Sequence, residues 1–164
     1  MTDCEILAAA QRLVELCAQK RVRISTAESC TGGLAAKRLT DVPGASAVFL
    51  GGVVSYTNGV KERVLGVPHE TLEAYSAVSE PTARAMAEGV RRLTGADFGV
   101  SVTGVAGPGR DDRGHDVGTV YIALSHKGGT EARLLHLSGD RDTIRTAAAD
   151  EMLRMLLTYL RQTK

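Results

Sequence analysis

The protein has 164 residues, which is the length of one domain, and we expect residues 1–164 to fold as a single unit. Its 20 basic and 19 acidic side chains leave a net charge of +1, so we expect no basic surface for nucleic acid or acidic lipid. Tryptophan is absent and only two Phe and four Tyr occur, which argues against a stacking platform for single-stranded bases. Glycine is abundant, with 18 residues, which indicates that the backbone approaches other groups closely.

The three cysteines are Cys4, Cys17 and Cys30, and none of them belongs to a Cys-x-x-Cys pair. This pattern argues against a disulfide framework and a thiolate zinc site, and it is typical of a reducing compartment. The segment after Met1 lacks the basic and apolar regions of a signal peptide, and no apolar run approaches the ~20 residues of a membrane span. We therefore expect a cytoplasmic protein without a membrane partner.

Hydrophobic periodicity divides the first half of the chain into helices and strands. Apolar residues at helical spacing from Ile6 to Cys17 predict the first helix, and the β-branched run after Val22 predicts the first strand. The apolar segment around Gly51 and Gly52 predicts a buried strand with an irregularity at the glycines. The predicted elements are helix 5–20, strand 22–26, helix 34–43, strand 48–56, and short helices 60–65 and 69–75.

The second half of the chain has clearer start and stop residues. Ser79 suits the N-cap and Pro81 suits the first turn of a helix that ends at Gly95. The remaining predicted elements are strand 98–103, a hairpin of strands 117–125 and 131–137, and a final helix 142–161. Strands interleaved with helices and followed by a hairpin predict an α/β fold, a single three-layer domain with a mixed, mostly parallel sheet between helices.

A Ser-Cys-Thr-Gly-Gly segment lies at the predicted junction of the first strand and the second helix. Unpaired amides at a helix N-terminus suit an oxyanion or a phosphate. The hydroxyl of Ser29 could attack a carbonyl there while neighbouring amides hold the developing oxyanion. The plainer alternative is that Ser29 or Thr31 caps the helix and that Gly32 and Gly33 make the turn.

A serine nucleophile needs a base, and none of the four histidines stands in a recognisable triad setting. Lysine can serve instead when burial lowers its pKa enough to supply a neutral amine. Lys61 follows the strand that ends near Tyr56, and the Asn58-Gly59 turn could bring both side chains to one strand end. The alternative is a solvated lysine that pairs with Glu62.

The densest glycine segment is 103–109, which follows a predicted strand. Its amides could cradle a phosphate or a carboxamide, and a plain surface turn is the alternative. The segment matches neither the Walker phosphate loop nor the dinucleotide-binding fingerprint. For the acidic loop 111–116 a solvated loop is favoured over a cation site, and for Cys30 a buried packing role is favoured over a nucleophilic one.

Six segments, in order along nearly the whole chain, together resemble the CinA C-terminal domain family. They are 27–33, 53–58 with Lys61, 77–80, 103–109, 118–123, and 139–141 with Ile144 and Arg145. Members that consist of this domain alone, the PncC-like proteins, are nicotinamide-nucleotide amidohydrolases. They convert nicotinamide mononucleotide to nicotinate mononucleotide and ammonia.

The resemblance implies a serine–lysine–tyrosine amidase. Ser29 would be the nucleophile, and Lys61 would be the general base. Tyr56 would relay or orient the proton. The oxyanion hole would be formed by the backbone amides of Cys30, Thr31 and Gly32.

The resemblance also implies that Thr103, Gly104 and Ala106 line the substrate pocket. Arg141 is our candidate for the phosphate contact because a guanidinium matches phosphate oxygens, and a surface ion pair is its alternative. No metal and no cofactor are implied. The expected partners are a small-molecule nucleotide and further copies of the chain, in a homodimer or a larger homo-oligomer.

The chain departs from the family pattern at 110–116, where charged residues replace the usual glycines and a Lys-Pro pair. This departure leaves the substrate range and the oligomer contacts open. The main hypothesis is hydrolysis of the carboxamide of nicotinamide mononucleotide in pyridine-nucleotide salvage. The alternatives are a non-catalytic nucleotide-binding or regulatory module, which would have no use for Lys61, and an amidase for a different small amide.

Overall fold

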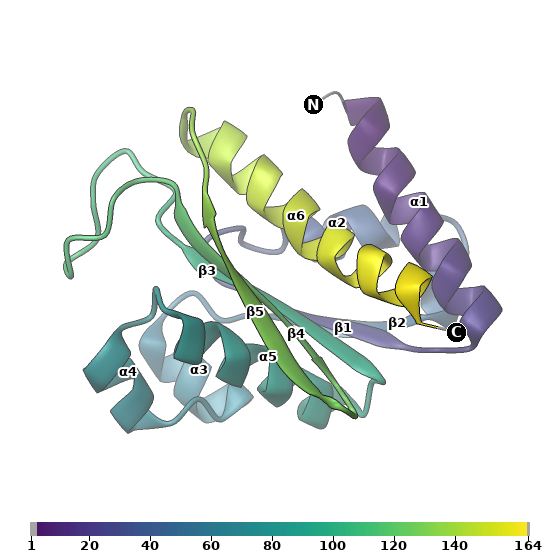
Figure 1. The fold of residues 1–164 in the computed structure, drawn as a ribbon, viewed down its shortest axis with the longest axis horizontal. Coiled ribbons are helices and arrows are strands. Elements are labelled where there is room, and N and C mark those ends of the chain that lie inside the picture. Colours follow the sequence, from purple (N-terminus) through teal and green to yellow (C-terminus); the bar gives the residue numbers. More distant parts are fainter. Residues whose placement is uncertain (1–2, 164) are drawn as a thin grey trace.

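The computed structural model describes residues 3–163, which form a five-stranded sheet between two layers of helices (Figure 1). The helices are α1 (Asp3–Lys20), α2 (Leu34–Thr40), α3 (Asn58–Leu65), α4 (His69–Tyr75), α5 (Glu80–Thr94), α6 (Arg141–Gln162) and the short 3-10 helix η1 (Ala45–Ala47). The strands are β1 (Ile24–Glu28), β2 (Phe49–Val54), β3 (Phe98–Gly104), β4 (Thr119–His126) and β5 (Gly129–His136). The three-layer α/β fold predicted from the sequence is confirmed.

The strand order in the sheet is β2-β1-β3-β4-β5. Strand β1 pairs in parallel with β2 and β3, whereas β3 with β4 and β4 with β5 are antiparallel. Only β4 therefore runs against the other strands, and the sheet is mixed and mostly parallel, as predicted.

The second strand is not buried, contrary to the prediction. Strand β2 lies at the edge of the sheet, and its residues are half-buried on one face and exposed on the other, with Leu50 and Val54 38% and 49% exposed. The predicted irregularity does occur beside the glycine pair. The partner of β1 changes from Phe49 to Gly51 in one step, so Leu50 is an extra residue in the ladder.

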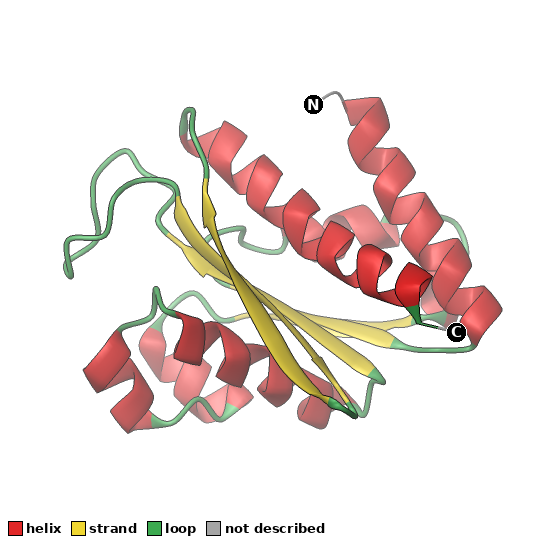
Figure 2. Ribbon diagram, viewed as in Figure 1, coloured by secondary structure: helices red, strands yellow, loops and turns green. Residues whose placement is uncertain are grey.

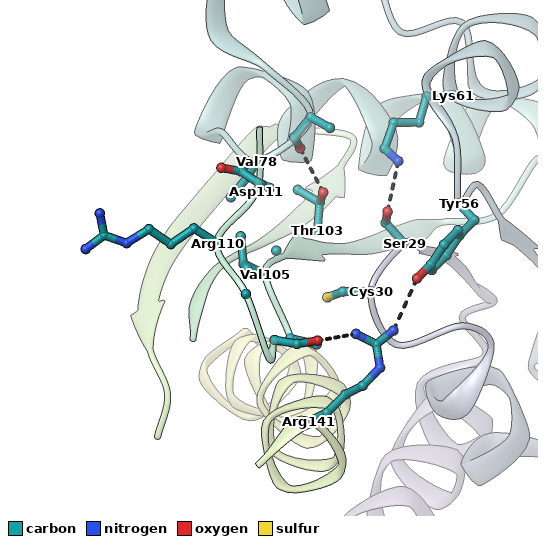
Figure 3. A pocket seen from close by; sticks show the side chains of 15 residues that line it. Ser29, Cys30, Tyr56, Lys61, Val78, Thr103, Val105, Arg110, Asp111 and Arg141 are labelled. Atoms are coloured by element: carbon teal, nitrogen blue, oxygen red, sulfur yellow. Dashed lines mark hydrogen bonds between the residues drawn. The ribbon is translucent and has the colours of Figure 1, made fainter. Parts of the chain in front are cut away.

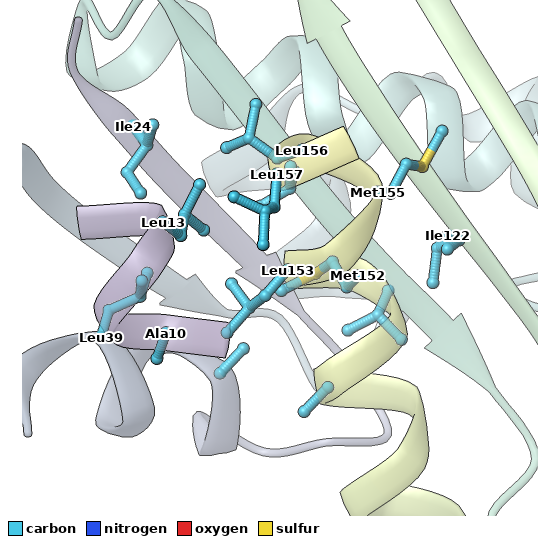
Figure 4. Close-up of a cluster of buried hydrophobic side chains, with 14 of the residues drawn as sticks. Ala10, Leu13, Ile24, Leu39, Ile122, Met152, Leu153, Met155, Leu156 and Leu157 are labelled. Atoms are coloured by element: carbon cyan, nitrogen blue, oxygen red, sulfur yellow. The ribbon is translucent and has the colours of Figure 1, made fainter. Parts of the chain in front are cut away.

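Helices α1, α2 and α6 cover one face of the sheet, and α3, α4 and α5 cover the other (Figures 1 and 2). The larger core lies under α1, α2 and α6 (Figure 4). Its fully buried side chains include Leu13, Ile24, Leu39, Ile122, Leu124, Ile144, Met152 and Leu156. These residues hold the helical layer that carries α2, and hence the turn between β1 and α2, against the sheet.

Helix α5 anchors the opposite layer. Its predicted ends are confirmed, because the Ser79 hydroxyl accepts from the amide of Thr82 and Gly95 closes the helix with a φ of 71°. Gly89 lies against the last residue of α3, where a Cβ would stand 2.0 Å from the carbonyl oxygen of Leu65. The missing side chain thus allows α3, and with it the candidate base, to lie close to α5.

The topology places a switch point at one end of the sheet. Strand β1 stands between β2 and β3, and the chain leaves β1 towards one face through α2 and leaves β2 towards the other through α3–α5. In open α/β sheets, ligands bind beyond the carboxyl ends of the strands at such a switch point.

The thiols of Cys17 and Cys30 are free, whereas the side chain of Cys4 lies outside the described part of the chain. No helix within residues 3–163 has a stretch long and apolar enough to cross a bilayer.

Candidate active site

A cavity of about 290 Å³ lies at the carboxyl ends of β1 and β3 (Figure 3). Its volume is close to the lower end of the range for small-molecule sites, about 300–1,000 Å³. Eight of the ten site residues predicted from the sequence line it: Ser29, Cys30, Tyr56, Lys61, Thr103, Gly104, Ala106 and Arg141. The topology therefore brings together four segments that are far apart in sequence.

Ser29 and Lys61 are in direct contact. Ser29 follows the last residue of β1, and its amide donates to the carbonyl oxygen of Val102 on β3 at 3.0 Å. Lys61 lies on α3, and its Nζ is 2.9 Å from the Oγ of Ser29 and 2.6 Å from the carbonyl oxygen of Ser55. The two elements thus place an amine within proton-transfer distance of a hydroxyl.

The side chain of Lys61 has no exposed surface, and no carboxylate pairs with it in the described part of the chain. Burial lowers the pKa of Lys61 from its ordinary value to about 8, because the charged form loses its hydration. About a tenth of the amine is then neutral at pH 7, and its lone pair can accept the hydroxyl proton of Ser29. The solvated-lysine alternative is wrong.

Tyr56 lines the same cavity as this pair. Its hydroxyl accepts from the guanidinium of Arg141 at 3.2 Å, and Arg141 also donates to the carbonyl oxygen of Gly107 (Figure 3). The ring is 61% exposed, because Tyr56 follows the edge strand β2. No hydrogen bond joins Tyr56 to Ser29 or Lys61 within residues 3–163. The hydrogen bond that a proton relay from the tyrosine to the reacting pair requires is therefore absent from this arrangement.

The turn after Ser29 corrects the predicted oxyanion hole. The turn closes on itself, because the amide of Gly32 donates to the carbonyl oxygen of Ser29 at 3.1 Å. This amide is therefore not available to an oxyanion. The amides of Cys30 and Thr31 donate to no protein oxygen in the described part of the chain. Cys30 lines the cavity, whereas Thr31 and Gly32 do not. Two amides without a protein oxygen acceptor thus lie next to the nucleophile, and of their two residues Cys30 lines the cavity.

Sequence reasoning missed Glu28, the last residue of β1. Its carboxylate is 1% exposed and accepts from the hydroxyl of Thr31 at 2.6 Å. It also accepts from the amides of Gly33, Ala35 and Ala36 at 2.8–3.1 Å. The donors at the start of α2 are therefore occupied, and the prediction that they bind a phosphate or oxyanion is wrong. An acidic residue at the end of a buried strand, just before a Ser/Gly turn, was the available indication.

The wall formed by the β3 end is tied to the loop before α5. The hydroxyl of Thr103 donates to the carbonyl oxygen of Ala77 at 2.8 Å. The lining residues that sequence reasoning did not select are Ala77, Val78, Val105, Gly107, Gly109, Arg110 and Asp111. Most of them lie within or beside segments that the sequence had already indicated. Which residues of these segments face the cavity could not be predicted from the sequence.

The charged loop 110–116 forms the outer rim of the cavity. Arg110 pairs with Asp116 at 2.6 Å, and Asp111 contacts the ring of His115 at 2.7 Å. Partial burial opposes the ionisation of Asp111, but hydrogen bonds from His115 and from backbone amides outweigh it and hold its pKa below the ordinary value. Within residues 3–163, no group of three or more His, Cys, Asp or Glu is placed to hold a metal.

The thiol of Cys30 is poorly suited to act as a nucleophile. Burial raises its pKa to about 11, so the thiolate is scarce at neutral pH. The side chain is 7% exposed and belongs to the larger core. The packing role favoured from the sequence agrees with this environment.

Comparison with known proteins identifies the family to which this fold and these sequence segments belong. The family model of the CinA C-terminal domain matches residues 7–160. A CinA-like protein of Anaeromyxobacter sp. (strain K) is 55% identical over 139 residues, which are 85% of this chain and 34% of that protein. The chain thus spans about a third of the length of such curated relatives.

Solved structures match over nearly their whole length. The competence damage-inducible protein A of Klebsiella pneumoniae has a TM-score of 0.94 at 33% identity, covering 97% of this chain and 99% of that one. The competence/damage inducible protein CihA of Agrobacterium tumefaciens has a TM-score of 0.91 at 40% identity, with 96% of both chains covered.

Proposed function

Because the chain belongs to the CinA C-terminal domain family, we propose that it is an amidohydrolase for the carboxamide of nicotinamide mononucleotide. The products would be nicotinate mononucleotide and ammonia. The observation that carries the proposal is the 2.9 Å contact between a buried lysine, Lys61, and the hydroxyl of Ser29. A non-catalytic nucleotide-binding module has no need for a buried amine with a lowered pKa.

The first half of the reaction would acylate the serine. The neutral amine of Lys61 accepts the hydroxyl proton while the Oγ of Ser29 attacks the carboxamide carbon. The negative charge that develops on the carbonyl oxygen is stabilised by the amides of Cys30 and Thr31, which donate to no protein oxygen in the described residues. Lys61 then protonates the leaving nitrogen, the carbon–nitrogen bond breaks, and ammonia departs from an acyl-enzyme.

The second half would release the acid. A water molecule takes the place of ammonia, and Lys61 accepts one of its protons as the water oxygen attacks the acyl carbon. The same two amides hold the second oxyanion. Collapse of this intermediate returns the proton to the Oγ of Ser29 and frees the carboxylic acid, which then loses its own proton to water.

The substrate would be held by Arg141, which also lines the cavity. Two of the five N–H groups of Arg141 are engaged by Gly107 and Tyr56, which fixes the guanidinium at the cavity edge. Its remaining donors suit the 5′-phosphate of a nucleotide. Tyr56 would then act in substrate placement through Arg141. Assembly into a homo-oligomer stays a prediction.

The test is release of ammonia from nicotinamide mononucleotide. The wild type should release ammonia, Ser29→Ala should not, and the unphosphorylated riboside should be a poorer substrate. Ser101→Ala is the matched control, because Ser101 is a buried serine of β3 that donates to the carbonyl oxygen of Ala83, away from the cavity. Full activity of Ser29→Ala would refute the mechanism, and an inactive wild type would refute the substrate.

A further inference from the structure

The turn that carries the nucleophile is held on both sides by buried or half-buried charges. We infer that Glu28 and Arg145 are positioning residues, which hold the turn 29–32 so that two amides remain free for the oxyanion. This inference rests on the proposed function. Neither side chain lines the cavity, and each would act through the backbone of the turn.

Glu28 closes the base of the turn. Its Oε2 accepts from the hydroxyl of Thr31 and from the amides of Gly33 and Ala35, and its Oε1 accepts from the amide of Ala36. Helix α2 has no side-chain cap at Gly33, so the carboxylate of Glu28 supplies the cap from the preceding strand. The chain between the strand and the helix is therefore fixed at both of its ends by one side chain.

The same carboxylate determines which backbone amides remain without a protein acceptor. It takes the amides of Gly33, Ala35 and Ala36, and the amide of Gly32 is used within the turn. Those of Cys30 and Thr31 are the donors beside Ser29 that contact no protein oxygen in the described residues. Because Glu28 occupies the amides at the start of α2, the negative charge that develops on the substrate is bound by the amides beside the nucleophile instead.

Arg145 holds the other side of the turn. It lies on α6, and its guanidinium donates to the carbonyl oxygens of Cys30 at 3.1 Å and Thr31 at 2.9 Å. The carbonyl of Cys30 and the amide of Thr31 belong to one peptide group, so a cation on the oxygen makes the N–H a stronger donor. Arg145 therefore orients and polarises a peptide group whose amide is free.

The main chain links this turn to the base. The carbonyl oxygen of Glu28 accepts from the amide of Ser55 at 2.8 Å, and the carbonyl oxygen of Ser55 accepts from Lys61. The side chain of Glu28, in contrast, makes no hydrogen bond or ion pair with Lys61 in the described part of the chain. A change confined to the carboxylate should therefore alter the oxyanion donors and leave the titration of the lysine as it is.

The first test uses Glu28→Gln, which keeps the shape but replaces one acceptor oxygen by an amino group that faces backbone donors. We expect kcat for nicotinamide mononucleotide to fall about tenfold or more, as for other losses of oxyanion stabilisation. We expect KM to change by less than about threefold, since the interaction is made in the transition state. The pH midpoint of kcat/KM should stay that of the wild type. Arg145→Met, a substitution on α6, should likewise lower kcat and leave KM nearly unchanged.

The second test does not depend on the substrate. A fluorophosphonate reacts with an activated serine as the Oγ–phosphorus bond forms, fluoride leaves, and Lys61 takes the hydroxyl proton. Mass spectrometry of the labelled Ser29 peptide gives the rate, and we expect it to fall about tenfold or more in Glu28→Gln and in Arg145→Met. Circular dichroism at the assay temperature confirms that each variant is folded. Ser101→Ala, which loses one buried hydrogen bond elsewhere, should melt earlier but react at the wild-type rate.

The outcomes separate the two proposals. Wild-type kcat and labelling rates in folded Glu28→Gln and Arg145→Met would overturn the positioning role while the proposed function stands. If one variant does not fold, the other decides. A wild type that labels readily but releases no ammonia would refute the substrate alone. A wild type that does neither would refute the proposed function and this inference with it.

Discussion

The Nζ of Lys61 lies 2.9 Å from the Oγ of Ser29, and the lysine side chain has no contact with solvent. Lys61→Met keeps the length and removes the amine. We expect ammonia release to fall by about 10²–10⁴-fold, the usual contribution of a general base. Steady-state ammonia assays at pH 8 would measure the loss, and a variant that retains more than a tenth of the activity would contradict the role of Lys61.

The lowered pKa of Lys61 predicts how activity depends on pH. Only the neutral amine can accept the proton of Ser29, so kcat/KM should rise about tenfold per pH unit below pH 8 and level off above it. A profile of kcat/KM between pH 6 and 10 checks this. A flat profile, or one with a midpoint near 10.5, would mean that the buried lysine does not titrate in the active enzyme.

Stability should depend on pH through the same residue. The pKa of Lys61 is about 8 in the folded protein and ordinarily 10.5, so between these values the unfolded chain binds more protons. The burial penalty is complete below pH 8 and disappears as the pH rises towards 10.5, and its full size is on the order of 3 kcal/mol. Lys61→Met lacks this penalty. Urea denaturation should show the variant to be more stable than the wild type at pH 7, with a gap that narrows by pH 10, and a constant gap would contradict the assignment.

Much of the fold could be predicted because it follows from local patterns. The helical stripe of α5 and its ends at Ser79 and Gly95 depend on neighbouring residues alone, and the structure confirms them. The hairpin of β4 and β5 follows from a short glycine-containing turn. The position of β2 depends instead on the order of strands in the sheet, and periodicity does not contain that order. The apolar pattern therefore predicts a buried strand, whereas β2 lies at the edge of the sheet.

The candidate site could be predicted in part for the same reason. Ser29, Lys61 and the loop after β3 were selected because their residue types suit a chemistry and follow strand ends. The hydrogen bonds inside the turn were not predictable, since the acceptor of each amide depends on where Glu28 and Arg145 lie in space. Arg145 follows the turn by more than a hundred residues, and only the packing of α6 on α2 brings it there.

The buried thiol of Cys30 predicts resistance to alkylation. Its pKa of about 11 leaves little thiolate at pH 7.5, and its side chain is 7% exposed. Iodoacetamide should therefore leave Cys30 unmodified in the folded protein and modify it after unfolding in urea. Peptide mass spectrometry measures both. Rapid alkylation of the folded protein, with loss of activity, would restore a nucleophilic cysteine as a competing hypothesis.

The close packing of α5 on α3 predicts an unusual response to a helix-favouring substitution. Replacing glycine by alanine inside a helix ordinarily stabilises it by about 0.5–1 kcal/mol. At Gly89, however, the new Cβ would stand 2.0 Å from the carbonyl oxygen of Leu65. This oxygen belongs to the backbone, so relieving the clash requires α3 to move, which costs free energy. We expect Gly89→Ala to lower the free energy of unfolding by about 1–3 kcal/mol. Because α3 carries Lys61, the displacement should also lower kcat/KM.

Gly59→Ala is the matched control, since Gly59 is also helical but its new Cβ would meet only the flexible end of Arg63 at 3.2 Å. Urea denaturation of both variants should show a loss for Gly89→Ala and no loss for Gly59→Ala. Equal effects would mean that α3 can move away from α5 without cost. The position of the buried lysine would then be set by the contacts of Lys61 with Ser29 and Ser55 rather than by the packing of its helix.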